Sequence, residues 1–361
     1  MNGLGQRVVV EGLLNLDGLA GLHKLVHVRR HGRSHDIGEC HGSTRSHAQI
    51  QTQGSVRPNL GRVWRVSVRC AVIPAAGMGT RFLPATKAVP KELLPIGDTP
   101  LLQLVIDEAL GAGIDHIVVV SSRSKPGIDA YFEESPEVIK ALEAQGRTEL
   151  ADRIRSIGSD WRATIVYQDE PRGLGHAVGC ARDAVGDQPF AVMLPDELMG
   201  DSSLLAHMNG VCISSGGSVV GLKRVPMADV GAYGVIEPLS PVDPDGVVAI
   251  GGMVEKPDPK DAPSDLIIIG RYVLTPDVFA EIESLPPGRG GEIQLTDALR
   301  IQAARSPFHG VLSDIERFDT GNPLGYLKAA ISIMLRHPGI GNEVAAFLAE
   351  ITADTDRDEA R

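Results

Sequence analysis

Apolar and polar residues alternate along the chain in two ways, as short apolar runs and as longer segments with one apolar face. CAVIP at 70–74 is a continuous apolar run that leads into a glycine-rich stretch, which is typical of a buried strand. Residues 100–110 repeat apolar side chains at helical spacing and predict a helix that ends at Gly111. Further strands are predicted at 117–120, 164–167 and 190–194, with a helix from about 174 to 185.

Strands that alternate with helices indicate an α/β fold, with a mostly parallel sheet covered by helices on both faces. The strand patterns come closer together after residue 215, which predicts added antiparallel strands. Strands are expected at 218–222, 247–255 and 266–274, and helices near 277–284, 294–304, 322–336 and 342–351.

The first 66 residues differ from the rest of the chain. They hold six of the eleven histidines, and no helix or strand period is sustained after about residue 30. His23, His27, His31 and His35 would share one helix face as a metal site, but Gly32 and the flanking arginines oppose both helix and cation. We therefore expect a dispensable segment, either a disordered basic leader or a mis-assigned start. The folded domain is expected at 67–352 and a charged tail at 353–361.

Charge is distributed unevenly within a net charge of −11. Residues 1–70 contain 10 Lys and Arg against 4 Asp and Glu, whereas the remainder contains 25 against 42. An acidic body argues against general nucleic-acid binding, so a bound polyphosphate would need a few placed cations and a metal ion. No apolar run approaches the roughly 20 residues of a membrane span, and the four cysteines form no CxxC pair. We expect a cytoplasmic protein without a disulfide framework or zinc ribbon.

The segment AVIPAAGMGTRFLPATKAVPKELLP at 71–95 is the most informative part of the sequence. Small residues follow the first strand, so a base or phosphate can approach the backbone, whose N–H groups can form an anion-binding concavity. Arg81 and Lys91 add two cations, and Lys87 is a third candidate. The glycines fit neither the GxGxxG fingerprint nor the GxxxxGK[ST] P-loop, and alone they could mark only a tight turn. Pro84, Pro90 and Pro95 predict an extended loop that wraps a ligand.

Two further segments place polar groups at the ends of predicted strands. YQDEPRGLGHA at 167–177 closes a strand and opens a helix, whose N-terminus favours an anion, although GLG fits a simple strand–helix turn equally well. LPDELM at 194–199 puts Asp196 directly after a buried strand, which suits a magnesium ligand, although a helix N-cap or turn aspartate is a common alternative. Spacing alone leaves both alternatives open.

The pattern GxGTRxxPxTxxxPKxxLP at 77–95 resembles the signature of the sugar-phosphate nucleotidyltransferases. ATK at 85–87 and PKE at 90–92 separate the chain from the thymidylyl- and adenylyltransferase branches of that family. The resemblance extends from about residue 69 to 350. It implies a Rossmann-like, glycosyltransferase-A-like fold and the Mg²⁺-assisted transfer of the uridylyl group of UTP to glucose 1-phosphate, without a covalent intermediate.

The resemblance also implies roles for individual residues. Arg81 and Lys91 would serve the triphosphate and the leaving pyrophosphate. Asp196 would hold the metal, with Asp319 as a second candidate, and Lys256 would hold the sugar phosphate. The other implied residues are Ala75, Ala76, Gly77, Gly79, Glu92, Gln168 and Gly173 for the nucleotide, with Gln168 reading the uracil edge, and Gly234, Glu255 and Gly270 for the sugar.

Three alternatives stay open. The first is the same chemistry with another nucleotide, chiefly dTTP. The second is a non-catalytic regulator that binds nucleotide sugars, but a binder would not require Arg81, Lys91, Asp196 and Lys256 together. The third is a nucleic-acid-binding role confined to residues 1–66. For the working enzyme we expect a homodimer or homotetramer.

Overall fold

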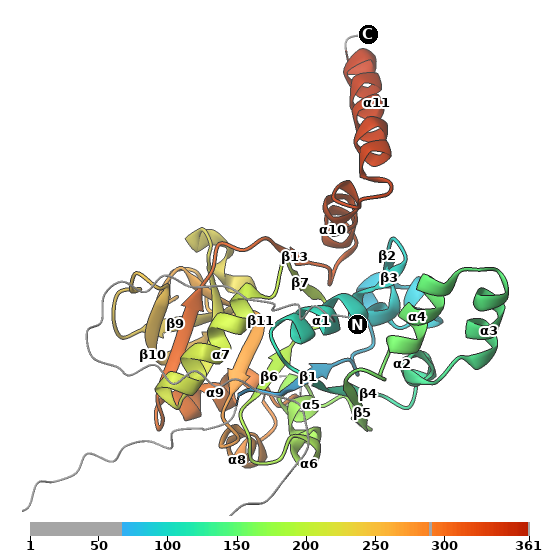
Figure 1. Ribbon diagram of the computed structural model, residues 1–361. Helices are drawn as coiled ribbons and strands as arrows, with labels where there is room; N and C mark the ends of the chain where they lie inside the picture. Colours follow the sequence, from blue (N-terminus) through green and yellow to red (C-terminus); the bar gives the residue numbers. More distant parts are fainter. Residues whose placement is uncertain (1–66, 289–290, 360–361) are drawn as a thin grey trace, which may run out of the picture. The chain divides into compact units, whose positions relative to one another are not determined.

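The structure is a computed structural model that describes residues 67–288 and 291–359 (Figure 1). The leader predicted at 1–66, with its four regularly spaced histidines, lies outside the described residues. Within the described part of the chain, no helix is both long enough and apolar enough to cross a membrane.

The centre of the described chain is one mixed sheet of nine strands. Two small two-stranded sheets accompany it, one made of β7 (Glu197–Met199) and β13 (Arg317–Asp319), the other of β2 (Pro95–Ile96) and β3 (Thr99–Pro100). In sheet order, the nine strands are β5 (Arg162–Tyr167), β4 (His116–Ser121), β1 (Cys70–Pro74), β6 (Phe190–Met193), β11 (Leu266–Leu274), β8 (Ser218–Arg224), β12 (Phe308–Leu312), β10 (Val247–Glu255) and β9 (Gly234–Pro238).

The sheet has a parallel half and a largely antiparallel half. β5, β4, β1 and β6 run parallel, with Val72 of β1 level with Val118 of β4 and Val192 of β6. β11 pairs antiparallel with β6 and β8, and β10 pairs antiparallel with β9 and β12, whereas β12 runs parallel to β8. The predicted α/β class, with antiparallel strands added to a parallel sheet, is therefore confirmed.

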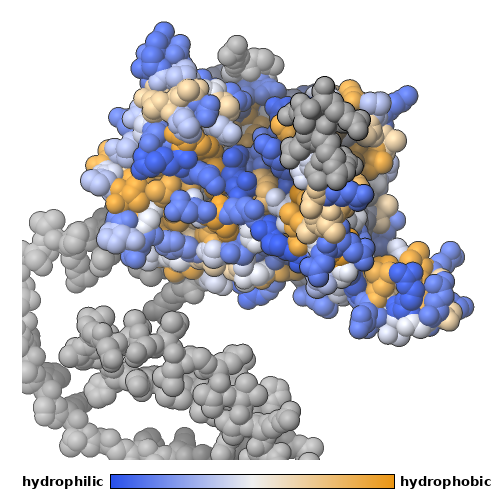
Figure 2. Space-filling model, turned by 90° about the horizontal axis from the view of Figure 1, so that it is seen from above, coloured by the Kyte–Doolittle hydropathy of each residue, from blue (hydrophilic) through white to orange (hydrophobic). Residues whose placement is uncertain are grey.

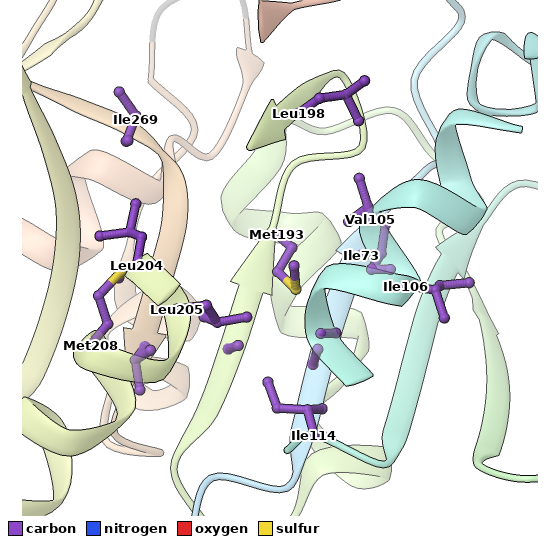
Figure 3. Close-up of a cluster of buried hydrophobic side chains, with 14 of the residues drawn as sticks. Ile73, Val105, Ile106, Ile114, Met193, Leu198, Leu204, Leu205, Met208 and Ile269 are labelled. Carbon is purple, nitrogen blue, oxygen red and sulfur yellow. The ribbon is translucent and has the colours of Figure 1, made fainter. Parts of the chain in front are cut away.

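Helices cover both faces of the sheet. Alternate residues of β1 face opposite ways, as the period of a strand requires. Ile73 lies beside α1, in a buried cluster to which α7 also contributes (Figure 3), and Val72 belongs to a second cluster with residues of α5, α8 and α9. The helices are α1 (Leu101–Gly111), α2 (Pro126–Phe132), α3 (Pro136–Ala144), α4 (Thr148–Ser156), α5 (Leu174–Cys180), α6 (Arg182–Val185), α7 (Ser203–Ser215), α8 (Val278–Ser284), α9 (Leu295–Ala303), α10 (Pro323–Leu335) and α11 (Gly341–Glu359).

Most predicted elements agree with the structure, but two predicted helices differ from it. The helix predicted at about 174–185 is two helices, α5 and α6; Gly179 lets α5 approach Ile282 of α8, where an added Cβ would lie 3.2 Å from Ile282 Cγ2, but glycine also weakens a helix. The helices α2, α3 and α4 were not predicted. The helix predicted to end near 351 continues to Glu359, into the segment expected as a tail.

The predicted extended loop after β1 is also different in the structure. It folds into three 3₁₀ turns, η1 (Thr80–Phe82), η2 (Ala85–Lys87) and η3 (Lys91–Leu93). The prolines exclude a continuous α-helix here, because each lacks a backbone N–H, but a single 3₁₀ turn fits between them. A fourth 3₁₀ segment, η4 (Met227–Ala232), precedes β9.

Candidate active site

The order of strands in the sheet arranges the site. In open α/β sheets, ligands bind beyond the carboxyl ends of the strands. Here those ends carry Gln168 after β5, Lys125 after β4, the Ala75 loop after β1 and Asp196 after β6. Neighbouring strands are about 4.8 Å apart, so these groups follow one another across the sheet edge in that order.

The loop after β1 is shaped by Gly79. This residue has a φ of 63°, in the left-handed region that glycine adopts without strain. Thr86 Oγ1 donates a hydrogen bond to the Gly79 carbonyl at 2.8 Å, which ties η1 to η2. A Cβ at residue 79 would lie only 3.3 Å from Lys91 Cβ, so the loop folds tightly back on itself. The result is that Arg81 from η1 and Lys91 from η3 reach the same region.

Two cations and two carboxylates meet beyond β6. Lys91 Nζ lies 2.5 Å from Asp196 Oδ2. A Cβ placed at Gly321 would lie 3.0 Å from Asp196 Oδ2, 3.0 Å from Asp319 Oδ1 and 3.4 Å from Arg81 Nη1, so all three side chains approach this glycine. Arg81 Nη1 also lies 3.5 Å from the Gly321 carbonyl. The structure therefore brings together four charged residues from three segments that lie far apart in the sequence.

The two carboxylates are held by the segment between β13 and α10. The backbone N–H and hydroxyl of Thr320 both donate to the Asp196 carbonyl, at 2.7 and 2.9 Å. Asp319 accepts hydrogen bonds from the Gly321 N–H at 2.9 Å and from Asn322 Nδ2 at 3.3 Å. Asn322 Oδ1 in turn caps α10 by accepting from the Gly325 N–H at 2.9 Å. The start of α10 thus fixes where Asp319 lies.

This pair of carboxylates fits a magnesium ion bound together with phosphates. The described residues contain no group of three or more His, Cys, Asp or Glu side chains arranged to hold a metal. Mg²⁺ does not need one, since it is usually bound through one or two carboxylates, substrate phosphates and water. Asp196 and Asp319 supply oxygen ligands of that kind on one side of the loop cations.

A cavity of about 370 Å³ opens beside the charged cluster. Glu255 and Lys256 line it at the end of β10, and Lys256 Nζ lies 3.2 Å from Glu255 Oε1. Thr296 donates to Glu255 Oε2 at 2.8 Å. Lys256 has a φ of 47°, which costs a non-glycine residue energy and is found most often at functional sites. The predicted residues that line this cavity are Arg81, Asp196, Gly234, Glu255, Lys256, Gly270 and Asp319.

The glycines predicted to make room for a sugar have close neighbours. A Cβ at Gly270 would lie 2.8 Å from both Leu194 Cβ and Glu197 Cγ, so this glycine lets β11 pack against the segment that carries Asp196. A Cβ at Gly234 would lie 3.3 Å from Glu255 Oε2. Packing excludes a side chain at Gly270, whereas one at Gly234 would require Glu255 to shift slightly. The role of both glycines toward a sugar stays a prediction.

A buried ion pair supports the other side of the loop. Lys125 Nζ donates to both carboxylate oxygens of Glu92, at 3.1 and 2.9 Å, and to the Ala75 carbonyl at 2.7 Å. Glu92 is 1% exposed. Burial raises the pKa of Glu92 and lowers the pKa of Lys125, while their mutual attraction opposes both shifts. Glu92 thus acts on Ala75 through Lys125, whereas its predicted place beside the nucleotide stays a prediction.

Gln168 and Gly173 are joined directly. Gln168 is 6% exposed, and its Nε2 lies 3.1 Å from the Gly173 carbonyl and 2.9 Å from His176 Nδ1. Gly173 has a φ of 93°, and a Cβ there would lie 2.8 Å from the Ile293 carbonyl, so only glycine fits. Among the remaining predicted residues, Ala76 is partly buried and Gly77 is exposed, with no atom of the described residues within 4 Å of an added Cβ at Gly77.

The charged side chains that hold the backbone around the site were not predicted from the sequence. Arg271 is fully buried, pairs with Glu108 at 2.8 and 2.6 Å, and donates to the backbone carbonyls of Leu194, Glu197 and Gly270. Arg317 pairs with Glu197 at 2.5 Å. Lys125 had a readable signal, because it follows a predicted strand just as Asp196 does. The two arginines gave none, because their carboxylate partners lie more than 100 residues away in sequence.

Known proteins resemble this chain over most of its length. The family model for nucleotidyl transferases matches residues 70–334. A UTP–glucose-1-phosphate uridylyltransferase of Bacillus subtilis is 41% identical over 288 residues, which cover 80% of this chain and 96% of that protein. A UTP-bound UGPase from Acinetobacter baumannii superimposes with a TM-score of 0.74 at 37% identity, covering 78% of this chain and 99% of that one. A UDP-glucose pyrophosphorylase in complex with UDP-glucose gives 0.67 at 38% identity, covering 75% and 100%. The chain therefore belongs to the nucleotidyl transferase family.

Proposed function

We propose that this chain transfers the uridylyl group of UTP to glucose 1-phosphate, giving UDP-glucose and pyrophosphate. The observation that carries the proposal is the meeting of Arg81, Lys91, Asp196 and Asp319 beside the cavity that Glu255 and Lys256 line. Two polyanionic substrates can react only where cations offset their charge, and this arrangement supplies cations on both sides of one point. The names of the relatives support the choice of uridylyl group and sugar.

We assign the parts of the two substrates to positions along the carboxyl edge of the sheet. The base lies at the ends of β5 and β4, near Gln168 and Gly173, and the triphosphate follows the loop from Ala75 to Lys91. The α-phosphate lies near Asp196, after β6. Glucose 1-phosphate occupies the cavity beyond it, with Lys256 on its phosphate and Glu255 accepting from sugar hydroxyls. The order of the strands supports this order of groups, because β5, β4, β1 and β6 are consecutive in the sheet and the next strand, β11, lines the cavity.

The mechanism requires positioning and charge neutralisation rather than a covalent intermediate. A phosphate oxygen of glucose 1-phosphate attacks the α-phosphorus of UTP in line, and pyrophosphate leaves on the opposite side. Lys256 holds the attacking phosphate in place, while Arg81 and Lys91 offset the charge that develops on the leaving pyrophosphate. Members of this family generally use a divalent metal. We propose Mg²⁺, held by Asp196 and secondarily by Asp319, which neutralises phosphate charge when bound.

A pyrophosphate-release assay tests the function directly. The purified chain is supplied with glucose 1-phosphate, Mg²⁺ and one of UTP, dTTP, CTP, GTP or ATP. We expect UTP to give the highest kcat/KM and EDTA to abolish turnover. A preference for dTTP would assign the chain to the thymidylyl branch, and binding of UTP without any turnover would favour the non-catalytic regulator.

The exposed side chains of α10 and α11 support the proposal of a homodimer or homotetramer. Leu324, Leu327 and Leu335 of α10 and Phe347 of α11 are all exposed, and apolar patches also interrupt the polar surface that is seen from above in Figure 2. Such patches on paired helices are typical of subunit contacts. Light scattering should give a mass of two or four chains, and Leu327→Glu with Phe347→Glu should lower it. A monomeric wild-type protein would refute this. The cytoplasmic location stays a prediction.

A further inference from the structure

The hydrogen bonds of Gln168 determine which way its amide group points. A backbone carbonyl can only accept a hydrogen bond, so the amide nitrogen and not the amide oxygen must face Gly173, 3.1 Å away. The second hydrogen of the same nitrogen faces His176 Nδ1 at 2.9 Å. His176 Nδ1 must therefore accept, which requires a neutral imidazole with its proton on Nε2.

The two acceptors differ in how firmly they are held. The Gly173 carbonyl belongs to a segment clamped to the start of α9, since the Gly175 N–H donates to the Ile293 carbonyl at 2.8 Å and the Ile293 N–H donates to the Arg172 carbonyl at 2.7 Å. His176 lies in the first turn of α5 and acts through its side chain. Burial and the cation of Arg172 lower the pKa of His176 below its ordinary value, which keeps it in the accepting form, while Glu170 acts the other way.

This arrangement leaves Gln168 Oε1 as the group that can meet a ligand. Within the described residues, Oε1 receives no hydrogen bond, and it is not among their fully buried atoms that lack a partner, so it stays accessible to a ligand. The imide N3–H of uracil donates a hydrogen bond, whereas N3 of cytosine accepts one. A fixed carbonyl oxygen at this position therefore suits the first base and repels the second.

We propose that His176 is a positioning residue for base selection, and that it acts by holding the Gln168 amide with its oxygen toward the N3 position of the pyrimidine. The proposal rests on the proposed function, because it takes the base to lie at the end of β5. With the amide turned over, Oε1 would face the Gly173 carbonyl, which can only accept, and His176 would have to move its proton from Nε2 to Nδ1 to match it. Loss of His176 removes one of these two constraints, so discrimination weakens without disappearing.

The test compares kcat/KM for UTP and CTP, with glucose 1-phosphate, in the full-length chain and its variants. His176→Phe keeps a flat ring but has no acceptor, whereas His176→Asn offers Oδ1 near the place of Nδ1. We expect His176→Phe to lower the ratio of UTP to CTP about 10-fold, which corresponds to about 1.4 kcal/mol, one hydrogen bond. We expect His176→Asn to keep the ratio within about 3-fold of the wild type, on the same scale.

Each outcome separates a positioning role from a structural one. If His176→Phe lowers turnover with both nucleotides equally and leaves their ratio unchanged, the proposal is wrong and His176 is structural. If His176→Phe does not fold, soluble His176→Asn decides the question: a lowered ratio of kcat/KM for UTP to that for CTP in this variant would contradict the proposal. Gln168→Ala should collapse the ratio; a retained ratio there would overturn the position of the base and with it this proposal. A wild-type chain that is inactive with UTP would instead refute the proposed function.

Discussion

At the end of the site formed by β4 and β5, Glu92 and Lys125 are buried and bonded to each other and to the Ala75 carbonyl. At the other end, the side chain of Lys256 is 62% exposed and pairs with its own neighbour Glu255. Both ends carry one cation and one carboxylate. They differ in what the charges contact, which is backbone and core at one end and the open cavity at the other.

This difference separates stability from chemistry. A buried charge is costly to remove from water, and removing its partner leaves the cost without compensation. An exposed pair contributes little to stability, because water screens it and solvates each partner. The end at β4 and β5, where we place the base and which we call the base end, should therefore hold the shape of the loop. The end at Asp196 and the cavity, which we call the phosphate end, should hold charges that can exchange one partner for another. The four predictions below test that separation.

The largest effect is expected from Lys125→Met. The substitution fills a similar volume but leaves Glu92 buried without its partner, so the free energy of unfolding should fall by about 3–5 kcal/mol. Urea unfolding measures this change. Adding Glu92→Gln should restore part of the loss, and Lys256→Met should change the free energy of unfolding little. A loss equal to that of Lys256→Met would mean that the buried pair does not support the fold.

Asp196→Asn tests the opposite end. The substitution keeps the size of the side chain and removes the charge expected to attract Mg²⁺, so kcat should fall about 100-fold or more. The midpoint of thermal unfolding should hardly move. Asp319→Asn is the matched control and should cost less. Near-normal turnover of Asp196→Asn at limiting Mg²⁺ would place the principal metal ligand elsewhere, and a larger loss in the control would place it at Asp319.

We expect Lys91 and Lys256 to contact different substrates, Lys91 the triphosphate and Lys256 the sugar phosphate. Each contact of a lysine with a phosphate contributes roughly 1.5–3 kcal/mol to binding. Lys256→Ala should weaken the binding of glucose 1-phosphate and UDP-glucose far more than that of UTP. Lys91→Ala should act chiefly on UTP and pyrophosphate, with a large loss of kcat. Calorimetric titration of each variant with each ligand decides between these patterns, and the reverse pattern would mean that the division along the sheet is wrong.

Some residues of the candidate site could be predicted from local patterns in the sequence. Arg81 and Lys91 lie in one short segment with Gly79, and Asp196 follows a run of apolar residues that marks a buried strand. Local pattern and strand ends are sufficient to find such residues. The strands β1, β10 and β11 were predicted with the bounds observed, because each is a mostly apolar run that begins directly after a polar residue or a glycine.

Pairings between distant segments were not visible in the sequence. Lys125 and Glu92 are 33 residues apart, Arg317 and Glu197 are 120 apart, and Arg271 and Glu108 are 163 apart. Nothing in a single sequence states which carboxylate a buried arginine will meet, because the pairing depends on how strands are ordered in the sheet. The helices α2–α4 were missed for another reason, since each has only seven to nine residues, too few for a sustained helical period.

The smallest effect concerns pH and the base end. Burial and Arg172 hold the pKa of His176 below its ordinary value, against the weaker opposing effect of Glu170, so the imidazole is neutral at pH 7 and gains a proton only in more acidic solution. Protonated Nδ1 donates and cannot accept from Gln168, so lowering the pH through this pKa should reduce the UTP to CTP ratio by a few fold, the scale of one weakened hydrogen bond.

The ratio is measured from about pH 8 to about pH 5, the range in which histidine titrates. The effects of phosphate ionisation largely cancel in it, because both nucleotides carry the same triphosphate. His176→Asn cannot titrate and should show a flat ratio. A wild-type ratio that is equally flat would mean that the protonation state of His176 does not control how Gln168 is held.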